Sequence, residues 1–214
     1  TIYINFMRNT CFIAAAILLA MACTGAAKLA HRRVAPLDSG LNIDSLNDCT
    51  LAVGFKASDI DWSGKTLSCS VFSKDLYDAV EVGHMRAGDT LIYEGKPMVV
   101  NSIEESRGAK VVNGGIETGG AELAPNGGGT YRTMLMDDHS VYTELGKVRL
   151  RLAENMVVID CGEDYHDPLD TIRANCKEYI DKLPDYRKDY FNCLNTEIVV
   201  EKGFVTEIRR RWIP

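Results

Sequence analysis

The sequence predicts an α+β protein that is mainly β, with an antiparallel curved sheet or a partly open small barrel and one amphipathic helix packed on it. Three observations support this fold class. Short runs of β-branched or alternating residues recur along the chain, separated by turn residues. Two tight turns, Glu94-Gly95-Lys96 and Glu201-Lys202-Gly203, join such runs into hairpins. A clear helical period is found over residues 167–183.

The β-rich part begins near Cys49 and continues as a series of short runs. Strands are expected at residues 49–55, 65–73, 90–93, 98–103, 130–136, 141–145, 147–152 and 155–160, and in both arms of a hairpin within 195–214. In the run 147–152, Val148 and Leu150 alternate with Arg149 and Arg151, so one face of this strand is expected to be buried and the other wet. Residues 74–82 fit either a helical turn or a strand, and periodicity leaves the choice open.

The predicted helix begins after Asp167, a good N-cap, with Pro168 at its first position and Asp170 near the positive end of its dipole. Its apolar face comprises Leu169, Ile172, Cys176, Ile180 and Leu183, which fit a helix packed on a sheet. A shorter helix is expected at residues 184–191. The run Arg209–Arg211 is expected to be a solvated strand end.

The N-terminal segment has the features of a signal peptide. Arg8 supplies positive charge, and the apolar run Phe12–Ala22 ends in small residues before Cys23. At about 1.5 Å per residue, this run is too short to cross a hydrocarbon core of about 30 Å. Residues 1–22 are therefore expected to be upstream residues and a signal peptide.

The residues Leu19-Ala20-Met21-Ala22-Cys23 resemble the lipobox of bacterial lipoproteins. The resemblance covers about the first tenth of the chain and implies an address, not an activity. It implies lipidation of Cys23 by a diacylglycerol and fatty acyl groups, with the protein anchored in a bacterial cell membrane or outer membrane and facing the periplasm or the cell exterior. Residues 23–48 would then be the lipidated cysteine and a flexible tether, and residues 49–214 a single mainly-β globular domain.

Charge and composition narrow the class of partner. The formal net charge of −6 argues against nucleic-acid binding, which usually needs a basic face to neutralise phosphates. The partners expected are the membrane, through the lipid anchor, and an envelope protein, a peptide or a glycan. Five cysteines follow Cys23, so at least one is unpaired within the chain, and the pairing is left open: Cys49, Cys69, Cys161, Cys176 and Cys193.

A glycine-rich stretch, "KVVNGGIETGGAELAPNGGGTYR" at residues 110–132, raises the question of a phosphate-binding loop. The lysine and hydroxyl residue of a P-loop are missing after Gly119, and no GxGxxG motif stands between a strand and a helix. Structural turns are the favoured interpretation. The alternative is a ligand loop formed by Asn113, Gly114, Gly115, Asn126 and Gly127.

Two acidic, histidine-bearing segments are the alternative site. Carboxylates and imidazoles together can hold a divalent metal, although the spacing fits no known metal-binding loop. Solvated turns and helix caps are the favoured interpretation. The candidate metal or ligand residues are Asp137, Asp138, His139, Glu163, Asp164 and His166.

Aromatic residues offer a further surface. Flat apolar rings with a polar edge suit a sugar or peptide groove, although filling of a small core is the favoured interpretation. The candidate groove residues are Trp62, Tyr77, Tyr93, Tyr131, Tyr142 and Trp212. No motif for nucleophilic catalysis is found, so no catalytic residue is assigned. The sequence therefore predicts a lipid-anchored envelope protein with a non-catalytic binding or scaffolding role. The alternative is a small envelope enzyme or metal-dependent binding protein that uses the Asp/His-rich turns.

Overall fold

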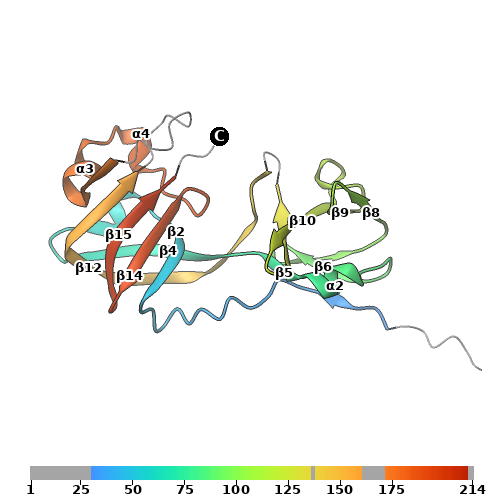
Figure 1. Ribbon diagram of the computed structural model, residues 1–214. Helices are drawn as coiled ribbons and strands as arrows, with labels where there is room; N and C mark the ends of the chain where they lie inside the picture. Colours follow the sequence, from blue (N-terminus) through green and yellow to red (C-terminus); the bar gives the residue numbers. More distant parts are fainter. Residues whose placement is uncertain (1–29, 136–137, 161–171, 212–214) are drawn as a thin grey trace, which may run out of the picture. The chain divides into compact units, whose positions relative to one another are not determined.

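The computed structural model describes residues 30–135, 138–160 and 172–211. The chain divides into two compact units, Thr1–Arg32 and Arg33–Pro214, and the first lies almost wholly outside the described residues. The described residues are mainly β, with 52% of them in strands and 14% in helices, which confirms the predicted fold class (Figure 1). The lipobox residues, including Cys23, lie outside the described residues.

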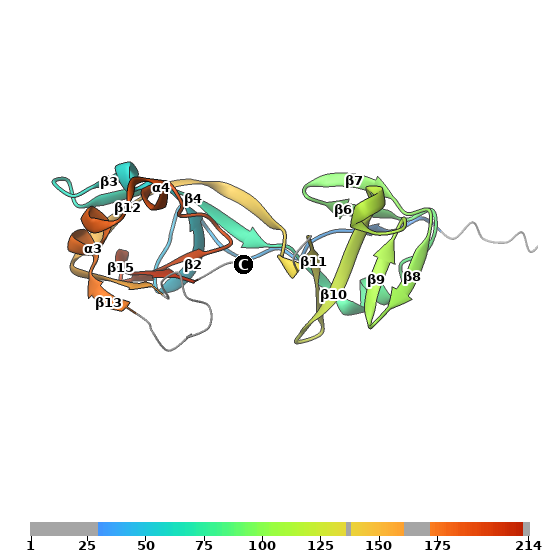
Figure 2. The ribbon, with the colours of Figure 1, turned by 90° about the horizontal axis from the view of Figure 1, so that it is seen from above.

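Five strands close into a barrel (Figures 1 and 2). They are β2 (Cys49–Gly54), β4 (Thr66–Lys74), β12 (Tyr142–Asp160), β14 (Thr196–Glu201) and β15 (Phe204–Arg210). Around the barrel the order is β2-β4-β12-β15-β14 and back to β2, and β12–β15 is the parallel pair. Short elements flank these strands: η1 (Ala57–Asp59), β3 (Ile60–Asp61), β13 (Ile172–Asn175), α3 (Cys176–Lys182) and α4 (Asp185–Lys188).

The connectivity of the barrel identifies its topology. The third and fifth barrel strands pair in parallel, the fourth returns to the first, and α3 lies between the third and fourth. This is the connectivity of the OB fold, a five-stranded Greek-key barrel. Closure of the β4–β12 pairing makes the barrel complete rather than partly open.

The barrel core is filled by inward side chains that alternate along each strand. Leu67, Cys69 and Val71 of β4 are each at most 5% exposed, and Leu150 and Leu152 of β12 are buried beside them. Ile180 of α3 packs on the same core. This alternation explains why the barrel strands could be predicted from a period of two residues.

Between β4 and β12 the chain forms a second set of elements with its own core. They are β5 (Leu76–Asp78), α2 (Ala79–Gly83), β6 (Thr90–Tyr93), β7 (Lys96–Val99), β8 (Ile103–Ser106), β9 (Ala109–Val112), η2 (Ile116–Thr118), β10 (Ala121–Gly127) and β11 (Thr130–Met134). The second core contains Tyr77, Leu91, Val112 and Leu123, all fully buried. The ambiguous segment 74–82 contains both expected structures, a short strand and a helical turn.

The predicted long helix is wrong in its first described part. Residues Ile172–Asn175 form strand β13, which pairs with Val157–Asp160 of β12. The helix begins after Asn175, whose side-chain Oδ1 accepts a hydrogen bond from the backbone N–H of Glu178 at 3.2 Å. The proposed N-cap Asp167 lies outside the described residues. The strand forms because the edge of β12 offers backbone partners that helical periodicity does not report.

The segment expected as a tether, residues 23–48, contributes to the second unit from Arg33 onward. Strand β1 (Arg33–Val34) pairs in parallel with β6, and Val34 is 1% exposed in the second core. Leu41 and Leu46 pack against the barrel core. Ordered contacts therefore begin before the expected domain boundary at Cys49.

No helix among the described residues is long and apolar enough to cross a membrane.

Candidate functional site

A basic groove of about 620 Å³ is the strongest site candidate on the barrel. One wall is the segment Ile43–Asn47, and the other side is formed by Lys147–Arg151 of β12 and by Lys202 and Gly203 of the β14–β15 turn. We use the name basic groove for these residues. Its size falls in the range of small-molecule and oligomer sites, about 300–1,000 Å³.

The alternation of β12 places the cations of the groove on the outer face of the barrel. Val148 and Leu150 point inward to the core, whereas Lys147, Arg149 and Arg151 are exposed. The expectation of one buried and one wet face is therefore confirmed. Side chains two residues apart on a strand lie about 6.5 Å from one another, so the three cations form a row about 13 Å long.

The neighbouring strand presents hydroxyl groups to this cation row. The register pairs Lys147 with Ser70, Arg149 with Ser68 and Arg151 with Thr66. Directly paired residues share one face of an antiparallel sheet, so the cations and the hydroxyls form adjacent rows. Such a surface supplies charge and neutral hydrogen-bonding groups together.

Three contacts hold the arginines of the row in place. Arg149 donates from Nε to the Thr66 hydroxyl at 3.1 Å, and its terminal nitrogen lies 3.8 Å from a carboxylate oxygen of Asp61. The guanidinium carbon of Arg151 lies 4.4 Å from the centroid of the Phe204 ring. With side-chain exposures of 66% for Arg149 and 44% for Asp61, this ion pair is weak, and Arg149 stays accessible to a ligand.

The wall of the groove is docked on the barrel by close contacts. A Cβ at Gly146 would lie 2.9 Å from Ile43 Cδ1, and Gly146 adopts a φ of 149°, a conformation that residues with a side chain rarely adopt. Asp48 Oδ1 accepts a hydrogen bond from the backbone N–H of Lys202 at 2.9 Å. The side chains of Leu41 and Leu46 anchor the segment on the barrel core.

The charge of the groove is opposite to that of the protein. Four cationic side chains line it, Lys147, Arg149, Arg151 and Lys202, against the single carboxylate of Asp44 among its described lining residues. The whole chain carries a net charge of −6. A local excess of positive charge in an acidic protein favours an anionic ligand.

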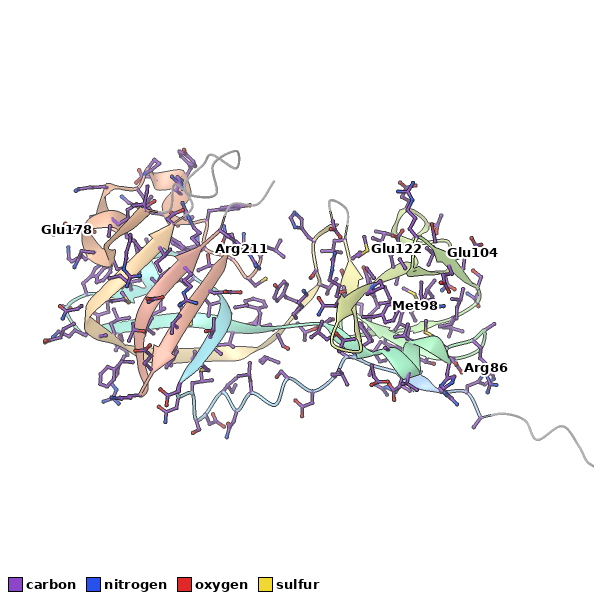
Figure 3. The ribbon with its side chains drawn as sticks, in the orientation of Figure 1. Arg86, Met98, Glu104, Glu122, Glu178 and Arg211 are labelled. Atoms are coloured by element: carbon purple, nitrogen blue, oxygen red, sulfur yellow. The ribbon has the colours of Figure 1, made fainter. Side chains whose placement is uncertain are left out.

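The predicted ligand loop in the glycine-rich stretch is held by internal contacts. The Asn113 side chain accepts from the backbone N–H groups of Asn101 and Ser102 and donates to the Val99 carbonyl at 2.8 Å. At Gly115, a Cβ would lie 2.7 Å from Oε1 of Glu122, a residue labelled in Figure 3. These contacts account for Asn113 and Gly115 as turn residues.

The second part of the loop also turns the chain. Gly127 adopts a positive φ of 81°, and a Cβ at Gly114 would lie 2.7 Å from the Thr118 hydroxyl oxygen. Asn126 Oδ1 accepts a hydrogen bond from Lys74 Nζ at 3.0 Å. Ligand binding by this loop stays a prediction.

The predicted Asp/His set is only partly described. Asp137, Glu163, Asp164 and His166 lie outside the described residues. Asp138 forms a short ion pair with Arg132, and the backbone carbonyl of the half-buried His139 accepts a hydrogen bond from Leu135. Within the described residues no group of three or more His, Cys, Asp or Glu side chains is arranged to hold a metal ion.

The described cysteines carry free thiols: Cys49, Cys69, Cys176 and Cys193. Burial raises the pKa of the Cys69 and Cys176 thiols to about 12. Thiols with such a pKa are almost fully protonated at neutral pH and are poor nucleophiles. Cys161 lies outside the described residues.

A smaller pocket of about 400 Å³ lies beside Trp62. The other predicted groove aromatics of the second core are buried or packed there; Tyr77, for example, is fully buried and donates its hydroxyl to the Ile92 carbonyl at 2.8 Å. Trp62 is half-buried against the barrel core and also lines this pocket.

Comparison with known proteins gives no relative: no family model, no curated protein and no solved structure matches the chain.

Sequence reasoning misses the basic groove. The alternation of cations along residues 147–151 is visible in the sequence, but by itself it indicates only a wet strand face. Nothing local in the sequence brings residues 43–47 and the turn at Lys202 beside that strand, because these three segments are far apart along the chain. The acidic total charge also gives no sign of a basic surface.

Proposed function

We propose that this protein is a non-catalytic binding module of the bacterial cell envelope, anchored by lipid on Cys23, and that its barrel binds an acidic glycan in the basic groove. The observation that carries the proposal is the row Lys147, Arg149 and Arg151 beside a row of hydroxyls. Cations at about 6.5 Å intervals complement carboxylates that repeat along a linear chain.

The neighbouring hydroxyls favour a glycan over a single-stranded nucleic acid. Proteins that bind single strands use exposed aromatic rings on which the bases stack. None of the described lining residues of the groove is aromatic, and the Arg151 guanidinium already packs against one face of the nearby Phe204 ring, a residue that is 37% exposed. Ser68, Ser70 and Thr66 can instead exchange hydrogen bonds with sugar hydroxyls.

Fold-level analogy agrees with this choice. In OB-fold barrels, the outer face of the second and third strands and the adjoining loops bind oligonucleotides and oligosaccharides. The corresponding strands here are β4 and β12, and Lys202 lies in the loop between the last two strands. The shared fold therefore supports a binding site on β4, β12 and the β14–β15 turn, but it does not identify the ligand.

The envelope address comes from the sequence, where residues 19–23 resemble a lipobox. Two or more acyl chains on Cys23 would give stable anchoring, at about 0.8 kcal/mol for each buried CH₂ group. A module held near a surface in this way meets envelope polymers at high local concentration.

The test is calorimetric titration with oligogalacturonate, a carboxylate-bearing glycan, with dextran as the neutral probe and oligothymidylate as another polyanion. Lys147→Gln combined with Arg149→Gln is expected to weaken oligogalacturonate binding about tenfold, since exposed charge pairs contribute about 0.5–1 kcal/mol each. The matched control is Lys56→Gln with Arg173→Gln, which removes the same charge at side chains 61% and 60% exposed.

The control variant is expected to bind within about twofold of the wild type, a difference well below 1 kcal/mol. Equal weakening of binding by both double variants would show that only the net charge of the protein matters, and it would contradict the assignment of glycan binding to the basic groove. Tighter binding of oligothymidylate than of oligogalacturonate would contradict the glycan assignment and identify a nucleic acid as the ligand.

A further inference from the structure

The pocket beside Trp62 is formed at one end of the barrel by three separate elements. Trp62 and Lys65 precede β4, Asn175 is the N-cap of α3, and Lys177 lies in its first turn; the lining residues from β12 are Leu152, Ala153, Glu154 and Met156. Its volume is about 400 Å³. None of its lining residues belongs to the basic groove.

A bulge in β12 opens this pocket. Leu152 is in register with Val205 of β15, but the next pairs join Val157 to Glu207, so β12 has several residues where β15 has one. Extra residues on one strand bend it away from its partner. The bulged residues Ala153, Glu154 and Met156 thereby form one side of the pocket.

The floor of the pocket is apolar and fixed. Leu152 and Met156 are 5% and 3% exposed and belong to the barrel core. Trp62 packs on that core while remaining half-buried, so part of its indole ring is open to the pocket. A flat indole on a rigid floor is suited to stacking against the CH face of a sugar ring.

The rim of the pocket carries positively charged, negatively charged and neutral hydrogen-bonding side chains. Lys65 Nζ and Glu154 Oε1 form an ion pair at 2.9 Å, with side chains 59% and 81% exposed. Lys177 Nζ lies 2.6 Å from Asp181 and 5.9 Å from the centroid of the Trp62 ring. Asn175 caps α3 through Oδ1, which leaves its amide N–H groups without a partner among the described residues.

We propose that this pocket is a second binding site, which stacks a pyranose ring of a glycan on Trp62. Sugar hydroxyls both donate and accept, so they can bond to Glu154 as well as to Lys65, Lys177 and Asn175. A purely apolar ligand would strip water from both members of the Lys65–Glu154 pair without replacing its hydrogen bonds.

The pocket adjoins the end of the cation row. Thr66 is in register with Arg151, and their neighbours Lys65 and Leu152 line the pocket. Asp61, which contacts Arg149, directly precedes Trp62. The further site thus deepens the proposed glycan binding and rests on it for the polymer's identity: an acidic chain along the row would place one ring at Trp62.

Fluorescence of Trp62 tests the site directly. The chain has two tryptophans, so a Trp212→Phe background reports Trp62 alone. Titration with oligogalacturonate is expected to give a saturable change in emission. Neutral cellohexaose is expected to give the same type of change with weaker affinity, because it uses the pocket without the cation row.

Binding measurements by calorimetry separate the two sites. Trp62→Ala is expected to weaken oligogalacturonate binding about tenfold or more and to abolish cellohexaose binding. Trp62→Phe keeps an aromatic ring and is expected to retain most of the affinity, which guards against a fold defect. Thermal unfolding followed by circular dichroism checks that each variant is folded.

The outcomes distinguish this inference from the function it deepens. If Lys147→Gln with Arg149→Gln weakens oligogalacturonate binding but Trp62 emission and Trp62→Ala change nothing, the pocket is not a sugar site. If cellohexaose alters Trp62 emission while the groove variant binds oligogalacturonate normally, the pocket stands and the groove proposal fails. An emission change with an apolar dye, but with neither sugar, would overturn the pyranose assignment.

Discussion

Asp160 and Arg210 form a buried ion pair in which a carboxylate oxygen and a guanidinium nitrogen lie 2.7 Å apart, with side chains 1% and 5% exposed. The parallel register of β12 and β15 sets the two residues opposite one another. The Tyr179 hydroxyl of α3 donates to the same carboxylate at 2.7 Å. This carboxylate therefore joins two barrel strands and the helix.

Removing Asp160 is expected to destabilise the barrel strongly. Asp160→Ala leaves the Arg210 guanidinium buried without its carboxylate, a change that costs about 3–5 kcal/mol in the free energy of unfolding. Urea denaturation measures this loss. The matched control is Asp181→Ala, which breaks an exposed pair with Lys177 and is expected to cost about 0.5 kcal/mol or less. Similar losses for both variants would contradict a special role for the buried pair.

Asp75 is expected to make stability depend on pH. It is 2% exposed, its Oδ1 accepts from the Thr143 hydroxyl at 2.7 Å, and its Oδ2 has no partner among the described residues. Burial, with a smaller effect of Glu94, raises the pKa of this carboxyl above its ordinary value. The folded protein thus binds this proton more tightly than the unfolded chain does.

Because of this difference, the free energy of unfolding is expected to fall as the pH rises. The stability gained from the neutral carboxyl is complete below the unfolded pKa and is lost as the pH rises through the raised folded pKa. The side chain of Asp75→Asn stays neutral at every pH. The free energy of unfolding of this variant, relative to that of the wild type, is therefore expected to increase as the pH rises from 4 toward 7. Urea unfolding of both proteins across this range measures the difference. A difference that does not change with pH would contradict the assignment.

Gly120 answers the question raised by the glycine-rich stretch, since close packing requires it. A Cβ there would lie 2.0 Å from the Val112 carbonyl oxygen, so Gly120→Ala is expected to destabilise the protein by about 3 kcal/mol. A Cβ at Gly83 in α2 would meet no atom within 4 Å, and Gly83→Ala is expected to stabilise by up to about 1 kcal/mol. Thermal unfolding compares the two variants. Equal effects would show that the close approach at Gly120 is relieved by small shifts.

Glycan binding to the basic groove is expected to weaken as salt rises. Exposed cations such as Arg149 are screened over about 10 Å at 0.1 M ionic strength and about 3 Å at 1 M. Calorimetric titration with oligogalacturonate at several salt concentrations measures the effect. The slope is expected to be shallower for Lys147→Gln with Arg149→Gln than for the wild type. Identical slopes would place the charged contacts elsewhere.

Lipidation is expected to depend on Cys23. In a bacterial host, the wild type should incorporate labelled palmitate and enter the detergent phase, and Cys23→Ser should do neither. Cys49→Ser is a suitable control, because Cys49 lies in strand β2 of the barrel. If the wild type takes up no label and stays in the aqueous phase, the proposed lipid anchoring in the cell envelope is contradicted. The proposal for the basic groove would not be affected.

The sequence predicts the local features of this fold well. The alternation along β4 and β12 is readable because each strand buries one face, and the Glu94-Gly95 turn is readable because its residues adopt φ values of 50° and 72°. The predicted mainly-β class is confirmed for the same reason. Barrel closure could not be predicted, because it depends on β4, β12 and β15 meeting across long separations in sequence.

The errors arise where tertiary contacts override local pattern. Residues 172–175 have a helical period, yet pairing with β12 makes them a strand. Arg210 belongs to a run predicted to be solvated, but its side chain is buried against Asp160. Charge runs at strand ends are usually exposed, and only the partner's position reveals the exception. The basic groove is missed for the same reason, since its wall comes from another part of the chain.

The length of β12 determines how the barrel opens. Its residues 142–151 are in register with β4 and its residues from Arg151 onward with β15, so Arg151 is the joint where the two ladders meet. Separation of one ladder need not break the other. Native-state hydrogen exchange should therefore show two different levels of protection along this one strand. A bound glycan that spans Arg151 is expected to make the two levels more similar.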